Sequence, residues 1–169
     1  MRHSFTLLCA GLALAVLAPV SQAAECRATK AVVASTTSMD ANKSAGGHVD
    51  IHITGQPTQV GKSRYTNWTQ FQNLFTQWQG NDDGKSPAPK TCGGAGGSQT
   101  DCIAISRLGG WKGGAATVCT AVDGSGNCTA SRNITVKAVA FGYYNNSKET
   151  KGLWIMNTSY PSENADCSQ

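Results

Sequence analysis

The chain has 169 residues, with 14 Lys+Arg against 10 Asp+Glu, 19 glycines and seven cysteines. This length favours a single domain. A charged fraction of 14% beside a hydrophobic fraction of 40% excludes a charge-driven disordered chain, and the absence of a Gly-X-Y period excludes collagen.

The first 23 residues have the pattern of a secretory signal peptide. Arg2 precedes an apolar run at 7–17, and Ser-Gln-Ala at 21–23 places small residues where a signal peptidase reads them. We expect cleavage between Ala23 and Ala24, which gives a secreted or periplasmic protein. The apolar run is too short to cross a bilayer, so we expect no membrane span. The mature chain, 24–169, has 146 residues and, without Arg2, a net charge of +3.

Cleavage also removes Cys9 and leaves six cysteines. An even number behind a signal peptide predicts three disulfides formed in an oxidising compartment. The pairs that we expect are Cys92–Cys102, Cys119–Cys128 and Cys26–Cys167. A zinc site is the weaker alternative, because there is no C-x-x-C and the two mature histidines lie far from the cysteines in sequence.

The first elements of the mature chain are predicted as a helix and a strand. Residues 25–44 lack Gly and Pro, which favours a helix or a long arm. Beyond them Val49, Ile51 and Ile53 alternate with polar residues, and this period of 2 is typical of a half-buried strand. Whether this segment is a strand or a helix, His48 and His52 would share a face.

A second helix is predicted after Thr66 or Asn67, either of which can cap it, and Gly80 ends it. Its apolar positions are Trp68, Phe71, Leu74, Phe75 and Trp78. We interpret these side chains as core. The absence of Lys and Arg from 66–78 disfavours nucleic-acid stacking on this helix.

The rest of the chain predicts loops and strands. Residues 80–101 are predicted as a loop without a nucleotide-binding motif, and twelve of the 19 glycines fall within 80–126. We therefore treat about 80–130 as a Gly/Cys-rich insertion in a single domain, 24–169. The predicted strands are 102–106, 116–122, 134–144 and 153–160, with a turn at 123–126 and Pro161 as the stop. The last two strands predict an antiparallel hairpin, and helices followed by strands predict an α+β domain.

The candidate chemistry depends on the two histidines of the mature chain, because standard catalytic motifs are absent and all six cysteines are expected to be bonded. Histidine has an unperturbed pKa of about 6.5, which suits proton transfer near neutral pH. Metal-free RNA cleavage needs a base, an acid and groups that stabilise charge on the phosphoryl group. The side chains that can supply these are His48, His52, Lys62, Arg64, Thr158 and Tyr160.

Three segments carry a resemblance to a known family. They are Ala45-Gly-Gly-His48 with His52, Ser63-Arg-Tyr-Thr-Asn67 before the predicted helix, and Gly152-Leu-Trp-Ile-Met-Asn-Thr158-Ser-Tyr160-Pro161. In order and approximate spacing they resemble the pancreatic-ribonuclease-like toxin domain at the C-termini of bacterial contact-dependent inhibition proteins. The similarity spans about 40–79 and 134–161, more than half of the mature chain.

This resemblance implies a ribonuclease A-like, kidney-shaped α+β fold with N-terminal helices and a twisted antiparallel sheet, and RNA cleavage without a metal or other cofactor. It implies catalytic roles for one histidine of the pair, for Thr158 and Tyr160, and for a basic residue, Lys62 or Arg64, that holds the phosphate. We favour His48 as the histidine. We expect a monomer that acts on RNA, with a cognate immunity protein as a candidate partner.

Two other function classes remain open. A non-enzymatic, disulfide-stapled secreted binding or inhibitor module would use exposed Trp111, Tyr143 or Tyr144 as anchors. A metal-dependent hydrolase would use His48 and His52, and it lacks a convincing third ligand other than the crowded Asp50 between them.

Overall fold

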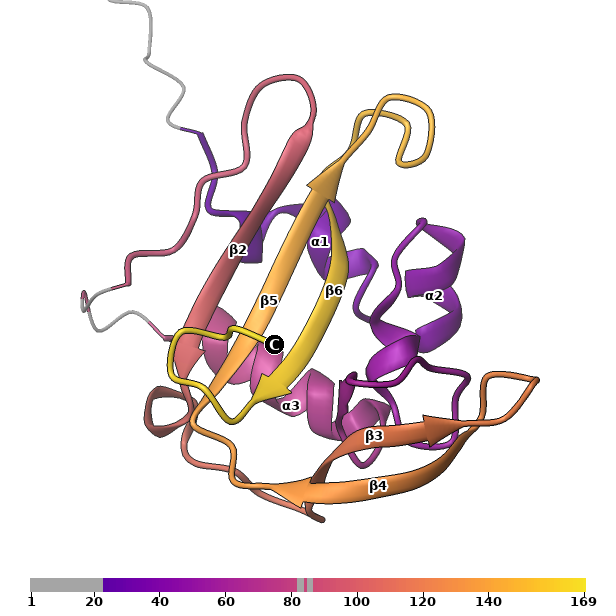
Figure 1. The fold of residues 1–169 in the computed structure, drawn as a ribbon. Coiled ribbons are helices and arrows are strands. Elements are labelled where there is room, and N and C mark those ends of the chain that lie inside the picture. The colour runs from indigo at the N-terminus through magenta and orange to yellow at the C-terminus, as the bar shows by residue number, and fades with distance from the viewer. Residues whose placement is uncertain (1–22, 82–83, 85–86) are drawn as a thin grey trace, which may run out of the picture.

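The computed structural model describes residues 23–81, 84 and 87–169. The expected signal peptide, 1–23, therefore lies almost wholly outside the described residues. The described chain has an α+β fold with two antiparallel three-stranded sheets, ordered β1-β3-β4 and β2-β5-β6 (Figure 1). Its helices and strands are α1 (Lys30–Ala34), α2 (Met39–Ser44), β1 (Ser63–Arg64), α3 (Trp68–Gln79), β2 (Gly97–Ala104), β3 (Ala116–Val122), β4 (Cys128–Ile134), β5 (Ala138–Asn145) and β6 (Ile155–Ser162). Short 3₁₀ helices are at Cys26–Ala28, Val49–His52 and Ile105–Leu108.

The helix predicted after Asn67 is confirmed as α3. The Asn67 side chain accepts a hydrogen bond from the Gln70 N–H at 2.9 Å, and Gly80 follows the last helical residue. The predicted apolar face is buried except for Trp68, which is half-buried, and the ring centroid of Phe75 lies 5.5 Å from that of Phe141 on β5. Figure 1 shows α3 behind the β2-β5-β6 sheet. The main core therefore lies between this helix and this sheet, and each large buried side chain contributes about 1.5–3 kcal/mol.

Residues 25–44 form short helices instead of one long one. The hydroxyls of Ser35, Thr36 and Thr37 each donate to the carbonyl three residues earlier, which competes with continued α-helical bonding after α1. Ser38 then caps α2 by accepting a hydrogen bond from the N–H three residues later. The hydroxyl run at 35–38 is the reason that the helix is interrupted.

The strand predicted around His48 is wrong, because Val49–His52 is a 3₁₀ helix. The fully buried Asn42 holds this segment in place. Its Oδ1 accepts a hydrogen bond from the Val49 N–H at 3.1 Å, and its Nδ2 donates to the Met156 carbonyl of β6 at 2.8 Å. His52 is buried whereas His48 is exposed, so the two histidines do not share a face.

The late strands confirm the predicted antiparallel hairpin, as β5 and β6, with β2 on the other side of β5. The single strand predicted over 134–144 is instead divided, because Ile134 ends β4 and Ala138 begins β5. Pro161 does not stop β6 but lies within it, opposite Val139. A proline is tolerated here because β6 is an edge strand of its sheet.

The disulfides confirm one of the three predicted pairs. Cys119–Cys128 joins β3 to β4, while the other bonds are Cys26–Cys92 and Cys102–Cys167. The predicted Cys92–Cys102 and Cys26–Cys167 pairs are wrong because backbone hydrogen bonds, such as Cys26 N–H to the Lys90 carbonyl at 2.8 Å, place the N-terminal segment beside Cys92. Cys102 therefore has no bond to Cys92 and pairs with Cys167 of the C-terminal segment instead.

The region expected to be an insertion, about 80–130, supplies β2 and β3. It therefore contributes one strand to each sheet. In the described part of the chain, none of the helices is long and apolar enough to cross a membrane.

We predict that Asn42→Ala destabilises the oxidised protein by about 2–4 kcal/mol, because it leaves buried backbone groups without partners. The free energy of unfolding in urea measures this. Asn73→Ala is the matched control, because Asn73 is exposed on α3, and it should change stability by less than about 0.5 kcal/mol. Equal effects of the two substitutions would show that Asn42 does not hold the segment.

Candidate active site

His52 lies at the end of the 3₁₀ helix, beside β1, and only 1% of it is exposed. Its Nδ1 is 2.7 Å from the Ser63 carbonyl, which can only accept, so Nδ1 carries the ring proton and Nε2 keeps its lone pair. The pKa of His52 is lowered to about 4, chiefly by burial and also by the Lys62 charge, while the Ser63 hydrogen bond and Asp50 act in the opposite direction. The imidazole is therefore neutral at neutral pH and can accept a proton at Nε2.

Tyr160 packs against this histidine. The ring centroids of Tyr160 and His52 are 5.2 Å apart, with the planes tilted by 30°. The Tyr160 hydroxyl donates to the Cys167 carbonyl at 3.0 Å, and burial raises the pKa of the phenol. A phenol that keeps its proton therefore lies beside an imidazole whose Nε2 can accept one.

Thr158 lies two residues before Tyr160 on β6, and side chains two apart share a face of a strand. It is half-buried and opposes Gly142 of β5. A Cβ at Gly142 would lie 2.8 Å from the Thr158 Cγ2, so only glycine leaves room for this threonine.

Arg64 is a buried cation on β1, and only 5% of it is exposed. Its Nη2 donates to the Thr117 hydroxyl of β3 at 3.3 Å, while its Nε is buried without a hydrogen-bond partner. Within the described residues Arg64 makes no ion pair. Burial lowers the pKa of the guanidinium. A buried charge without a counter-charge is costly, and a bound anion would compensate it.

The backbone places Arg64 next to the histidine. Its neighbours in the chain, Ser63 and Tyr65, both contact His52, Ser63 through its carbonyl and Tyr65 through an N–H that donates to the His52 carbonyl at 2.8 Å. Lys62, the alternative basic residue, is half-buried just before β1, and its charge acts on the same imidazole.

Sequence reasoning missed two residues that join the parts of this site. The Ser159 hydroxyl donates to the Ala140 carbonyl at 2.7 Å, so the Tyr65 hydroxyl is the donor in the 2.7 Å bond between Tyr65 and Ser159. Both side chains are fully buried. Alternation along β6 places Ser159 on the face opposite to its neighbours Thr158 and Tyr160, and this was the only available signal.

His48 is exposed, unlike His52, and its backbone N–H donates to the Asn157 carbonyl of β6 at 2.5 Å. Asp50, the third ligand of the metal alternative, instead forms an ion pair with Lys43 at 3.0 Å. The described residues contain no group of three His, Cys, Asp or Glu side chains that could hold a metal ion.

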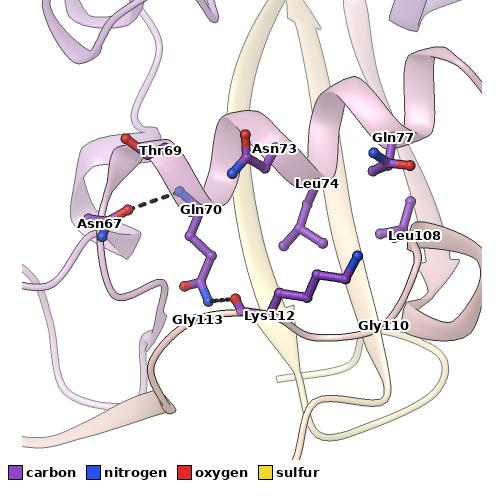
Figure 2. Close-up of a pocket in the computed structure, with 10 residues that line it drawn as sticks. All are labelled: Asn67, Thr69, Gln70, Asn73, Leu74, Gln77, Leu108, Gly110, Lys112 and Gly113. Carbon is purple, nitrogen blue, oxygen red and sulfur yellow. Dashed lines mark hydrogen bonds between the residues drawn. The ribbon is translucent and has the colours of Figure 1, made fainter.

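A cavity of about 510 Å³ lies elsewhere, between α3 and the loop that follows the last 3₁₀ helix (Figure 2). Its lining residues are Asn67, Thr69, Gln70, Asn73, Leu74, Gln77, Leu108, Gly110, Lys112 and Gly113. Figure 2 shows the amides of α3 along one wall and the Lys112 side chain along the other. None of the expected catalytic residues lines this cavity, and Lys112 is the only charged side chain among the described residues that line it.

The aromatic anchors expected for a binding module are largely engaged. Tyr143 is 1% exposed and donates to the Asp101 carboxylate at 3.0 Å, so it is not a surface anchor. Trp111 is half-buried and stacks on Tyr65, with 6.0 Å between the ring centroids, and Tyr144 is half-buried.

Comparisons with protein-family models, curated proteins and solved structures give no match to this chain. The resemblance stated from the sequence motifs therefore remains an interpretation.

We predict that His52 makes stability depend on pH. Because its folded pKa lies below the ordinary value of 6.5, this contribution is fully present above pH 6.5 and is lost as the pH falls toward 4. The loss should reach about 3 kcal/mol below pH 4. It is measured as the difference between the wild type and His52→Gln in the pH dependence of the free energy of unfolding. His48→Gln is the control and should follow the wild type; parallel curves for all three proteins would refute the prediction.

Proposed function

We propose that this protein is a secreted, toxin-like, metal-independent endoribonuclease. RNA is cleaved by attack of its own 2′-OH, which leaves a 2′,3′-cyclic phosphate and a 5′-OH. The observation that carries the proposal is Arg64, a buried guanidinium without a carboxylate partner in the described chain, which lies between Ser63 and Tyr65, two residues whose backbone groups hydrogen-bond to His52. A guanidinium in this state suits a phosphodiester, whose charge and paired oxygens match its fork of donors.

The neighbouring side chains fit the proton transfers. His52, neutral with Nε2 unprotonated, accepts the 2′-OH proton. Tyr160, whose pKa is raised, donates a proton toward the leaving 5′-oxygen, and Thr158 on the same face of β6 donates a hydrogen bond to the phosphoryl oxygens. Lys62 adds positive charge that holds the RNA backbone. This assignment replaces His48, the histidine favoured from the sequence, by His52.

The toxin-like role and a cognate immunity protein belong to the same proposal, and they rest on the resemblance of the three sequence segments. A net charge of +3 for the mature chain, without a run of basic residues, supports contact with only a few phosphates.

We predict that His52→Ala lowers the rate of RNA cleavage by about 10²–10⁴-fold, the range that a proton-transfer group supplies. The measurement uses the oxidised mature protein, a fluorescent RNA and EDTA. His48→Ala is the matched control and should retain the wild-type rate, because the His48 side chain is exposed and takes no part in the proposed proton transfers. A requirement for metal, or full activity of His52→Ala, would remove the proposed site.

Arg64 and Tyr160 are tested in the same assay. Arg64→Lys keeps the charge but loses the planar fork, so KM for RNA should rise by about tenfold. Tyr160→Phe should lower kcat, because only the proton donor is removed.

The pH dependence of cleavage tests His52 as the base. Because the pKa of His52 is about 4, kcat/KM should not fall as the pH is lowered through 6.5, as it would with an ordinary histidine.

The second candidate function is a binding module, and the amide-lined cavity favours it. Side-chain amides both donate and accept, which suits an uncharged, hydroxyl-rich ligand such as a neutral oligosaccharide. The side-chain amide resonances of Asn73 and Gln77 should shift on titration with maltotriose or an N-acetylglucosamine trimer. If no resonance shifts at ligand concentrations up to about 10 mM, any binding is weaker than ordinary millimolar binding, and these ligands are excluded.

A further inference from the structure

The C-terminal segment, 163–169, folds back over the sheet that carries the candidate site. In Figure 1 the yellow chain after β6 crosses in front of β5, on the side away from α3. Cys167 is bonded to Cys102 on β2, and it packs against the small cluster formed by Ala138 and Ala140 of β5. The segment therefore covers the outer face of β5.

Two contacts of this segment involve the candidate site. The Cys167 carbonyl accepts the hydrogen bond of the Tyr160 hydroxyl at 3.0 Å. The Gln169 Nε2 donates to the Ser63 hydroxyl at 3.4 Å, and the carbonyl of the same serine holds His52. The hydroxyl assigned to the leaving oxygen is thus occupied while the segment stays in place.

Besides the disulfide, single hydrogen bonds that each involve a side chain attach the segment to β6 and β1: Tyr160 to Cys167, Ser162 to Asn164 and Ser168, and Gln169 to Ser63. Other hydrogen bonds are internal to the segment and gather on Ser168. The Glu163–Arg132 ion pair fixes only its beginning. Cys167 itself has a φ of 59°, a left-handed conformation that a non-glycine residue adopts only when it is held.

The other two disulfides join segments that have further attachments. Cys119–Cys128 connects β3 and β4, which are also paired by backbone hydrogen bonds. Cys26 and Cys92 are both buried, and their backbone N–H groups bond across to the opposite segment. Cys102 and Cys128 are both half-buried, so each of these two bonds is open to attack at one sulfur, but only Cys119–Cys128 joins strands that are also paired by a backbone ladder.

We propose that the Cys102–Cys167 disulfide is a site of thiol–disulfide exchange, and that its reduction releases the C-terminal segment and frees Tyr160. The effect on RNA cleavage rests on the proposed function. A dithiol reductant attacks as a thiolate at the Cys102 sulfur and forms a mixed disulfide, and its second thiolate then resolves it. The dithiol loses two electrons and becomes a disulfide, while Cys102 and Cys167 gain the electrons and two protons and become thiols.

The first experiment removes this bond alone, in Cys102→Ser/Cys167→Ser, and compares it with Cys119→Ser/Cys128→Ser. Tyrosine nitration by tetranitromethane, mapped by mass spectrometry, reports on Tyr160. We expect its nitration to rise at least about tenfold in the first variant and to stay at the wild-type level in the second, as a freed phenol reacts and a bonded one does not. Equal protection of Tyr160 in both variants overturns the proposal. Tyr65, which is fully buried, must stay unreactive as the test of folding.

The second experiment uses the wild-type protein and does not depend on the variants folding. It is titrated with dithiothreitol, and the free thiols are alkylated and located by mass spectrometry. Cys102 and Cys167 should be labelled before the other four cysteines. Carboxypeptidase should release Gln169 over the same range of dithiothreitol concentration. Earlier labelling of either other pair overturns the proposal.

RNA cleavage separates this proposal from the proposed function. Faster cleavage after selective reduction, by about tenfold, supports both. Release of the segment without any cleavage leaves the exchange site in place and rejects the ribonuclease. Cleavage at the same rate before and after release keeps the ribonuclease and rejects control by the segment.

Discussion

The hydrogen bond between Tyr65 and Ser159 joins the two sheets, and the candidate site depends on it. Tyr65 directly follows β1, Ser159 lies on β6, and the serine donates in turn to the Ala140 carbonyl of β5. All of these groups are buried, so a lost partner would leave a desolvated hydroxyl, which is more costly than the bond is favourable. This constraint fixes β1 against β6 and so brings Arg64 and Tyr160 to the same part of the molecule as His52.

Burial then gives these side chains their chemical character. The same removal from water that lowers the pKa of His52 to about 4 raises that of Tyr160, so at neutral pH the imidazole is neutral and the phenol keeps its proton, the protonation states that their proposed roles need. Arg64 differs because a guanidinium keeps its proton in proteins. It remains charged and without an ion-pair partner in the described chain, which is the feature that distinguishes this region from an ordinary sheet junction.

Local sequence signals predicted those elements whose structure depends on near neighbours. The cap at Asn67 and the apolar spacing after it specify α3, and the strand at 116–122, the turn at 123–126 and the Cys119–Cys128 bond were also predicted, although β4 was not. The prediction of a strand after His48 was wrong because Asn42, together with β6, supplies the partners that make this segment a 3₁₀ helix. The predicted pairings of Cys26, Cys92, Cys102 and Cys167 were wrong for the same reason. The backbone hydrogen bonds that align Cys26 with Cys92 join residues far apart in sequence.

The sequence by itself determined the pattern of a signal peptide, the six cysteines that follow it, the α+β class and the set of side chains able to do proton transfer. Each of these follows from composition or from local periodicity. Only the tertiary structure decided which histidine is buried against Tyr160, that Arg64 lacks a carboxylate in the described chain, and that Cys167 lies over the site. Burial, pairing and the approach of distant segments are properties of packing, because they depend on residues that the local sequence does not contain.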